Sequence, residues 1–229
     1  LHDALPICLA KKEQLKLIVA HVNYQLRGQD SQADEELVKQ LASSYGLPCH
    51  ILRAPKKRSD EATLRQIRYD FFAQIQKKEK AQAVVLAHHQ DDQAETFLLQ
   101  LFRGSGTTGL KAMLPKRDFY VRPFLQITRQ EILAYLKRLG AQYNTDKSNT
   151  DTRYMRNRIR HELLPLLEEK YQPNIKASLA RTARLIQKVP EETQLQTIVC
   201  SVLERKTSCN FNQAELLSLK QTVRLSFLR

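Results

Sequence analysis

The sequence predicts an α/β fold in which a parallel sheet with helices on both faces precedes a smaller all-helical domain. Through the first half of the chain, short apolar runs alternate with longer segments of helical periodicity, and this β-α-β order gives parallel strands covered by helices. From residue 154 onward the apolar spacing is helical. We therefore expect one domain over residues 1–150 and a second, helical one over residues 151–229.

Three apolar runs have the length and the β-branched content of buried strands. They span residues 15–22, 49–53 and 83–88. Since ligands of open parallel sheets bind beyond the carboxyl ends of the strands, the polar segments at residues 20–28 and 87–96 are the predicted binding loops.

Helix signals fill the intervals between these strands. Residues 30–45, 60–80 and 91–103 carry apolar side chains three and four positions apart, the pattern of a helix with one buried face. A further helix is expected over residues 129–139, with Thr128 as its N-cap and Gly140 at its end.

The composition favours a polyanionic partner and argues against several classes of protein. The chain has 37 Lys and Arg against 24 Asp and Glu, a net charge of +13, and phosphates are the usual partners of a basic protein surface. No apolar stretch has the roughly 18 residues that a membrane helix needs, so we expect no membrane partner. The four cysteines are scattered, which argues against a metal knuckle or a disulfide scaffold and favours the cytoplasm.

The loop at residues 87–96 contains two histidines and three carboxylates and allows three interpretations. These groups could hold a divalent metal ion, or the acids could cap the following helix. In the third, which we favour, Asp92 and Glu95 project from one face of the helix and bind a cationic ligand. Arg68, on the preceding helix, either pairs with Asp92, binds a carboxylate, or is a solvated surface charge.

Arginines are concentrated around Tyr154, within residues 147–160. Guanidinium groups interleaved with an aromatic side chain suit contacts to RNA phosphates and bases. The alternative is a basic helix start that packs against the acidic sheet domain.

Four blocks of the sequence together resemble the bacterial tRNA(Ile)-lysidine synthases, which are N-type ATP pyrophosphatases of the PP-loop superfamily. The blocks are AHVNYQLRG at 20–28, RYDFF at 68–72, AHHQDDQAETFLLQLFRGSGTTGLKAM at 87–113 and NTDTRYMRNRIRHELLP at 149–165, and Arg122-Pro123 also fits. The third block is long and specific. The resemblance covers about residues 10–170 and implies a fold like that of the adenine nucleotide alpha hydrolases.

This resemblance implies a ligase that acts in two steps. ATP, with Mg²⁺, would adenylate the carbonyl oxygen at carbon 2 of the wobble cytidine of tRNA(Ile) and release pyrophosphate. The amine of free L-lysine would then attack that carbon, expel AMP and leave lysidine. The family's pattern implies that Arg68, Asp92 and Glu95 bind lysine, that Ala20, His21, Val22 and Asn23 bind ATP, and that Arg153, Arg156 and Arg160 bind tRNA. A homodimer is left open.

The chain departs from the family's pattern at its start. Family members open with a strand and a Ser-Gly-Gly-x-Asp-Ser loop that holds pyrophosphate, whereas residues 1–8 read LHDALPIC. We therefore expect this polypeptide to make lysidine inefficiently by itself; longer family members also carry a further tRNA-binding domain. Tyr24 stands where a histidine is common. Two other functions stay open: a tRNA-thiolating ATP pyrophosphatase, which would usually need a catalytic cysteine pair, and a non-catalytic RNA-binding module.

Overall fold

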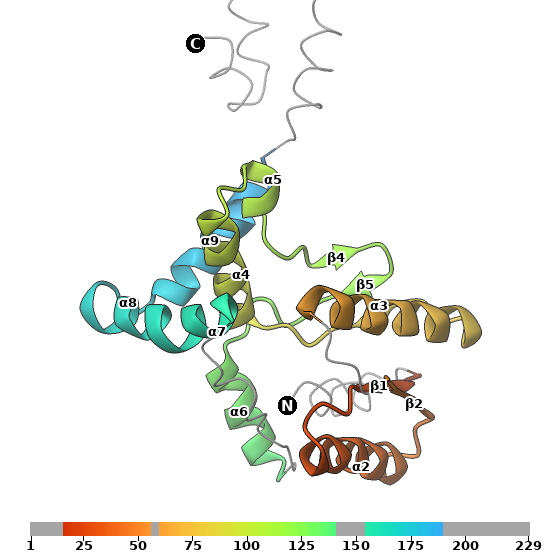
Figure 1. Ribbon diagram of the computed structural model, residues 1–229. Coiled ribbons are helices and arrows are strands. Elements are labelled where there is room, and N and C mark those ends of the chain that lie inside the picture. Colours follow the sequence, from red (N-terminus) through yellow and green to blue (C-terminus); the bar gives the residue numbers. More distant parts are fainter. Residues whose placement is uncertain (1–15, 56–59, 141–153, 190–229) are drawn as a thin grey trace, which may run out of the picture.

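The computed structural model describes residues 16–55, 60–140 and 154–189, and strands and helices alternate in it as expected (Figure 1). The first half contains β1 (Val19–Asn23), α2 (Gln29–Ser44), β2 (Cys49–Arg53), α3 (Glu61–Lys78), β3 (Val84–Val85) and α4 (Gln90–Phe102). The second contains α5 (Thr107–Leu110), β4 (Lys116–Arg117), β5 (Tyr120–Val121), α6 (Arg129–Arg138), α7 (Met155–Arg158), the π-helix η2 (Ile159–Leu163), α8 (Leu164–Lys170) and α9 (Ile175–Gln187). Among the described helices, none has the length and apolar character needed to span a membrane.

The strands form two small sheets. β1 and β2 are parallel, with Val19 opposite Cys49 and Asn23 opposite Arg53. β5 lies between β3, to which it is parallel, and β4, to which it is antiparallel. Within the described ranges no ladder joins β1 to β3, so the parallel strands predicted from the sequence are divided between the two sheets. β4 and β5 escape sequence prediction because each has two residues and lies outside the predicted apolar runs, whereas β3, which is as short, lies inside the run at residues 83–88.

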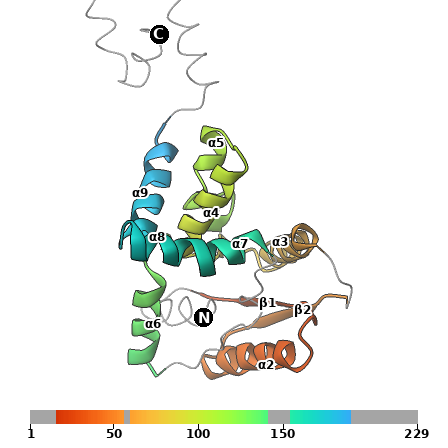
Figure 2. The ribbon, with the colours of Figure 1, turned by 60° about the vertical axis from the view of Figure 1, so that its left-hand side comes forward.

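Helices cover both faces of the β1–β2 sheet. Successive side chains of a strand point to opposite faces. Val19 packs with Val38 and Ala42 of α2, whereas Val22 packs with Phe71 of α3. Figure 2 shows α2 and α3 on either side of the strand pair, as the sequence predicts.

The helices after residue 154 pack against α4. Leu98 of α4 forms a buried cluster with Ile159 of η2 and Leu164 of α8, and α9 lies beside α4 in both ribbon views (Figures 1 and 2). This packing places the arginine-rich helix start next to α4. The predicted domain boundary at residues 150–151 lies outside the described residues.

Thr128 begins α6 through a reciprocal cap. The Glu131 N–H donates to the Thr128 hydroxyl at 3.1 Å, and the Thr128 N–H donates to the Glu131 carboxylate at 2.8 Å. Ile132 and Leu136 then pack against Phe124, next to the end of the β3–β5 sheet. The structure confirms the N-cap that the sequence predicts.

We expect Leu136→Ala to lower the free energy of unfolding by about 2–5 kcal/mol, the usual loss when a buried leucine leaves a cavity. Leu136 is 0% exposed, whereas Leu139, one turn on, is 50% exposed. Leu139→Ala removes the same atoms and should change the free energy of unfolding by about 0.5 kcal/mol or less. Urea unfolding followed by circular dichroism measures both, and equal losses would contradict the packing of α6.

Candidate functional site

Two buried carboxylates stand at the start of α4, shortly after the carboxyl end of β3. Asp92 is 4% exposed and Glu95 is 1% exposed, and residues three apart on a helix lie on the same side. Asp92 Oδ2 accepts a hydrogen bond from the His89 N–H at 3.0 Å. This acid therefore caps the helix with one oxygen and presents the other, together with Glu95, to the helical part of the chain.

The partners of these acids are two arginines that follow Tyr154. Arg156 of α7 donates from Nε to Glu95 at 2.9 Å and from Nη2 to Asp92 at 3.3 Å. Arg160 of η2 donates from Nε and Nη2 to the two oxygens of Glu95, at 2.5 and 2.8 Å, and from Nη2 to Asp92 at 3.2 Å. We call Asp92, Glu95, Arg156 and Arg160 the carboxylate–guanidinium cluster.

The local sequence explains how the arginines reach the acids. Arg156 and Arg160 are four residues apart and so lie on one side of the helix. Ile159 and Leu164, each 1% exposed, anchor this helix against Leu98. Ile159 and Leu164 are five residues apart across the π-helical turn η2. The i→i+5 hydrogen bonds of a π-helix bring residues at this spacing toward the same side. Single π turns inside helices are frequent at functional sites.

The cluster is stable because its charges compensate one another away from water. A buried carboxylate needs cations and hydrogen-bond donors in place of its lost hydration. Burial lowers the pKa of Arg160, but the hydrogen bond and charge of Glu95, with the charge of Asp92, raise that pKa by more, so it stands above its usual value. The side chains of Arg156 and Arg160 remain 26% and 29% exposed, so other ligands can reach them.

Arg68, which the sequence suggests as a partner of Asp92, has a different contact in the structure. Its guanidinium carbon lies 5.9 Å from the centre of the Tyr69 ring, and no ion pair joins it to Asp92 in the part of the chain that the structure describes. The charge of Arg68 also acts on Tyr24. Burial raises the pKa of the Tyr24 hydroxyl above its usual value, and the charge of Arg68 offsets part of that rise. The guanidinium partners of Asp92 come from the helical segment instead of α3.

Asp91 and Arg153 are the two remaining charged candidates from the sequence. Asp91, which the sequence suggests as a cap of its own helix, accepts a hydrogen bond from the Arg129 N–H at 3.1 Å and so meets the start of α6. Arg153 lies outside the described residues. The position of Arg156 and Arg160 agrees with the alternative in which the basic helix start packs against the acidic sheet domain.

The four residues expected to contact ATP lie along β1 and face both sides of the sheet. Ala20 and Val22 pack toward α3. His21 and Asn23 lie on the opposite face by alternation, and the Asn23 amide donates to Glu35 of α2 at 2.8 Å. The Asn23 side-chain oxygen accepts from the Gln25 N–H at 2.8 Å. Asn23 thus fixes the turn after β1, and the contact of these residues with ATP stays a prediction.

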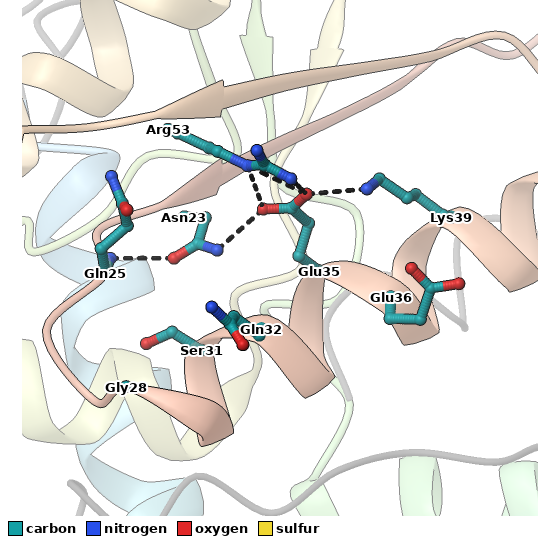
Figure 3. A pocket seen from close by; sticks show the side chains of 9 residues that line it. All are labelled: Asn23, Gln25, Gly28, Ser31, Gln32, Glu35, Glu36, Lys39 and Arg53. Carbon is teal, nitrogen blue, oxygen red and sulfur yellow. Dashed lines mark hydrogen bonds and ion pairs between the residues drawn. The ribbon is translucent and has the colours of Figure 1, made fainter.

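A hollow of about 330 Å³ opens beside Asn23, lined from the ends of β1 and β2 and from α2 (Figure 3). Glu35, 3% exposed, lines it. The Glu35 carboxylate accepts from Arg53 Nη2 at 2.7 Å and pairs with Lys39 at 2.8 Å. The hydrogen bonds of Arg53, then of Lys39 and Asn23, hold the pKa of Glu35 well below its usual range.

Sequence reasoning misses Glu35, although the sequence carries a signal for it. The buried residues of α2 are Ser31, Glu35, Val38 and Ala42, which form one helical stripe. An acid on such a stripe is almost never fully buried unless it is paired. A lone acid in the apolar stripe therefore indicates a buried ion pair, and here its partners come from the same helix and from the end of β2.

The metal-binding interpretation of residues 87–96 finds no support in the structure. Across residues 16–55, 60–140 and 154–189, no group of three or more His, Cys, Asp or Glu side chains could hold a metal ion. Asp92 and Glu95 are bonded to arginines, and Asp91 to the start of α6.

Glu35→Gln should make the protein less stable at neutral pH but not in acid. The pKa of Glu35 is lower in the folded chain than its ordinary value of 4.5, so its carboxylate contributes stability that is complete above that value and is lost as the pH falls further. The difference in unfolding free energy between wild type and variant should therefore be largest near about pH 7 and narrow toward about pH 3. Urea unfolding across this range measures it, with exposed Glu36→Gln as control. If the difference in unfolding free energy between wild type and Glu35→Gln does not change with pH, the ion pairs of Glu35 do not stabilise the fold.

Glu95→Gln should lower the free energy of unfolding by about 1–3 kcal/mol, because a neutral amide replaces one of the two charged acceptors of the Arg156 and Arg160 guanidinium groups. Glu162→Gln is the matched control, since Glu162 is exposed on the neighbouring π-helix. Urea unfolding of both variants gives the comparison. If the two changes have the same effect, the cluster does not stabilise the fold.

Comparison with known proteins agrees with this architecture. The profile of the PP-loop domain family matches residues 4–167. The tRNA(Ile)-lysidine synthase of Geobacter sulfurreducens is 44% identical over 84% of this chain and 42% of its own length. That of Bacteroides thetaiotaomicron is 42% identical over 72% of this chain and 40% of its own length. The chain thus spans about two fifths of the length of these relatives.

A solved structure shows the same fold. A U34-tRNA thiolase from Methanococcus maripaludis matches with a TM-score of 0.63 at 17% identity, over 81% of this chain and 68% of that one. At this identity the likeness concerns the fold alone, and with the profile it confirms the predicted adenine nucleotide alpha hydrolase-like class. Since the profile covers most of the sequence and the strands and helices agree with it, the chain belongs to the PP-loop domain family.

Proposed function

We propose that this chain supplies the PP-loop domain of a tRNA(Ile)-lysidine synthase, a carbon–nitrogen ligase. The observation that carries the proposal is its 44% identity to a tRNA(Ile)-lysidine synthase over 84% of the chain. In the first step ATP transfers its adenylyl group to the carbonyl oxygen at carbon 2 of the wobble cytidine, and pyrophosphate leaves. In the second, the amine of free L-lysine attacks that carbon, and AMP leaves with the oxygen.

The acidic pair suits an amino acid with two ammonium groups. Free lysine carries two positive groups and one carboxylate, so its site needs acids and a guanidinium. Asp92 and Glu95 are proposed to bind the ammonium groups, and Arg68 the carboxylate. The attacking amine must first lose a proton, and a carboxylate within hydrogen-bond distance is a suitable acceptor for it.

ATP is proposed to bind toward the carboxyl end of β1, with contacts from Ala20, His21, Val22 and Asn23 along that strand. Open parallel sheets bind ligands at this edge, and membership of the PP-loop family implies use of ATP. Mg²⁺ would stabilise the charge of the departing pyrophosphate. The described residues contain no group of three or more His, Cys, Asp or Glu side chains that could hold the ion, so we propose that it comes with the phosphates of ATP.

The tRNA is proposed to contact the helical segment within the domain at residues 151–229. The net charge of +13 suits a polyanion, and Arg153, Arg156 and Arg160 are the proposed contacts. Arg156 and Arg160 are partly exposed while they hold the acids. A cytoplasmic location agrees with the scattered cysteines, and a homodimer is compatible with this function but not required by it.

Sulfur transfer to tRNA is the alternative that we disfavour. Its support is a likeness of fold at 17% identity. Cys49, half-buried at the start of β2, is the one cysteine in the described part of the chain, whereas thiolating enzymes usually need a pair or a cluster.

Asp92→Asn in the full-length gene product should reduce the incorporation of labelled lysine into tRNA(Ile) by about 100-fold or more, because the ammonium group loses its charged partner and the amine its position. Asparagine keeps an oxygen that can accept from the His89 N–H, so the helix cap is retained. The affinity for tRNA(Ile), measured by filter binding, should not fall, because Arg156 and Arg160, the proposed phosphate contacts, keep their charges and lose only part of their hold on the acids.

The matched control is Glu162→Gln, which removes one exposed acid and should leave incorporation unchanged. Unaltered lysine incorporation by Asp92→Asn would contradict the proposed lysine site. Incorporation of sulfur instead of lysine by the wild type would contradict the proposed reaction.

A further inference from the structure

Resting on the proposed function, we propose that Arg156 and Arg160 compete within the chain with the amino-acid substrate for Asp92 and Glu95. They occupy the acids while RNA is absent, and RNA phosphates draw them away. The carboxylate–guanidinium cluster would then make lysine binding depend on tRNA binding.

The acids are already engaged in the structure. Glu95 Oε2 and Asp92 Oδ1 each accept hydrogen bonds from both arginines. Glu95 Oε1 accepts from Arg160, and Asp92 Oδ2 from the His89 N–H. An ammonium group needs the same oxygens and the same negative charge, so it gains full contact with them only when a guanidinium withdraws.

The acids cannot simply be left open. Glu95 is 1% and Asp92 4% exposed, and a buried carboxylate without a cation is strongly unfavourable. Exchange of a guanidinium for an ammonium group keeps the charge of the cluster unchanged. The state with a guanidinium on the acids and the state with an ammonium group on them therefore differ little in free energy, compared with a state in which the acids have no cation. A second ligand can then shift the equilibrium between these two states.

The arginines can leave without disturbing the helix that carries them. Ile159 and Leu164 hold this helix against Leu98, so rotation of the arginine side chains is enough. Arg156 and Arg160 are 26% and 29% exposed, which gives an RNA phosphate access to them. A phosphate accepts the same two-pronged guanidinium fork as a carboxylate.

Competition of this kind gives positive coupling between the two substrates. A tRNA that engages Arg156 and Arg160 frees the acids and so raises the affinity for lysine. By thermodynamic linkage, lysine raises the affinity for tRNA by the same factor. Free lysine would thus bind weakly until the RNA that is to be modified is present.

The test is calorimetric titration of L-lysine into this chain, with and without saturating tRNA(Ile). Wild type should bind lysine about fivefold or more tightly when tRNA is present, a typical size for coupling between sites. Arg156→Gln should tighten lysine binding in the absence of RNA by a similar factor and should lose most of the further gain from tRNA.

Two variants control for charge and folding. Arg158→Gln removes the same charge from an exposed position on the same helix and should leave lysine affinity and its response to tRNA as in wild type. Arg156→Lys keeps the charge but loses the fork, and its lysine affinity should lie between those of wild type and Arg156→Gln. Arg160 pairs with Glu95 in the wild type and should still do so in both Arg156 variants, and urea unfolding tests that each is folded.

Three results would contradict the proposal, and each identifies which part of it is wrong. Weaker lysine binding by Arg156→Gln would overturn the competition, because the arginine would then help to hold the ligand. Lysine binding that neither tRNA nor Arg156→Gln changes would overturn the coupling and leave the proposed function standing. Failure of wild type and variants to bind lysine under every condition would overturn the proposed function and the coupling with it.

Discussion

Two carboxylates with almost no access to water stand in the first turns of α4, and their need for cations joins the two parts of this chain. Asp92 and Glu95 follow the end of β3, whereas Arg156 and Arg160 lie between 61 and 68 residues further along the sequence. The apolar contact of Leu98 with the later helices fixes their position, and the ion pairs fix their rotation. Loss of the arginines would leave buried charges uncompensated, so the helical segment completes the sheet domain.

The same physical solution occurs at the end of the other sheet. Glu35 is buried beside the carboxyl ends of β1 and β2, and it holds Arg53 and Lys39 in fixed positions. Ligands of parallel sheets bind at strand ends, so in this protein buried acids orient cations at the places where substrates are expected.

The sequence predicts the helices and the acid pair, and it leaves two candidates for the partners of that pair, Arg68 and the basic helix start, without deciding between them. α2, α3, α4 and α6 each bury one face, so apolar periodicity finds them, and a spacing of three residues places Asp92 and Glu95 together. β4 and β5 have two residues each and lie outside the predicted apolar runs, so they escape prediction, whereas the equally short β3 lies in the run at residues 83–88. Arg68 is closer to Asp92 in sequence than Arg156 is, yet Arg156 forms the bond. That choice depends on how the later helices pack on α4, which no local pattern encodes.

The interdependence of Glu95 and Arg160 is the central claim, and a double-mutant cycle tests it most directly. The free energies of unfolding in urea of wild type, Glu95→Gln, Arg160→Gln and the double variant give the coupling between the two side chains. A buried, hydrogen-bonded pair predicts that the double variant loses about 1–3 kcal/mol less than the sum of the single losses. Losses that add to within about 0.5 kcal/mol would show that the two groups act independently and would contradict the account.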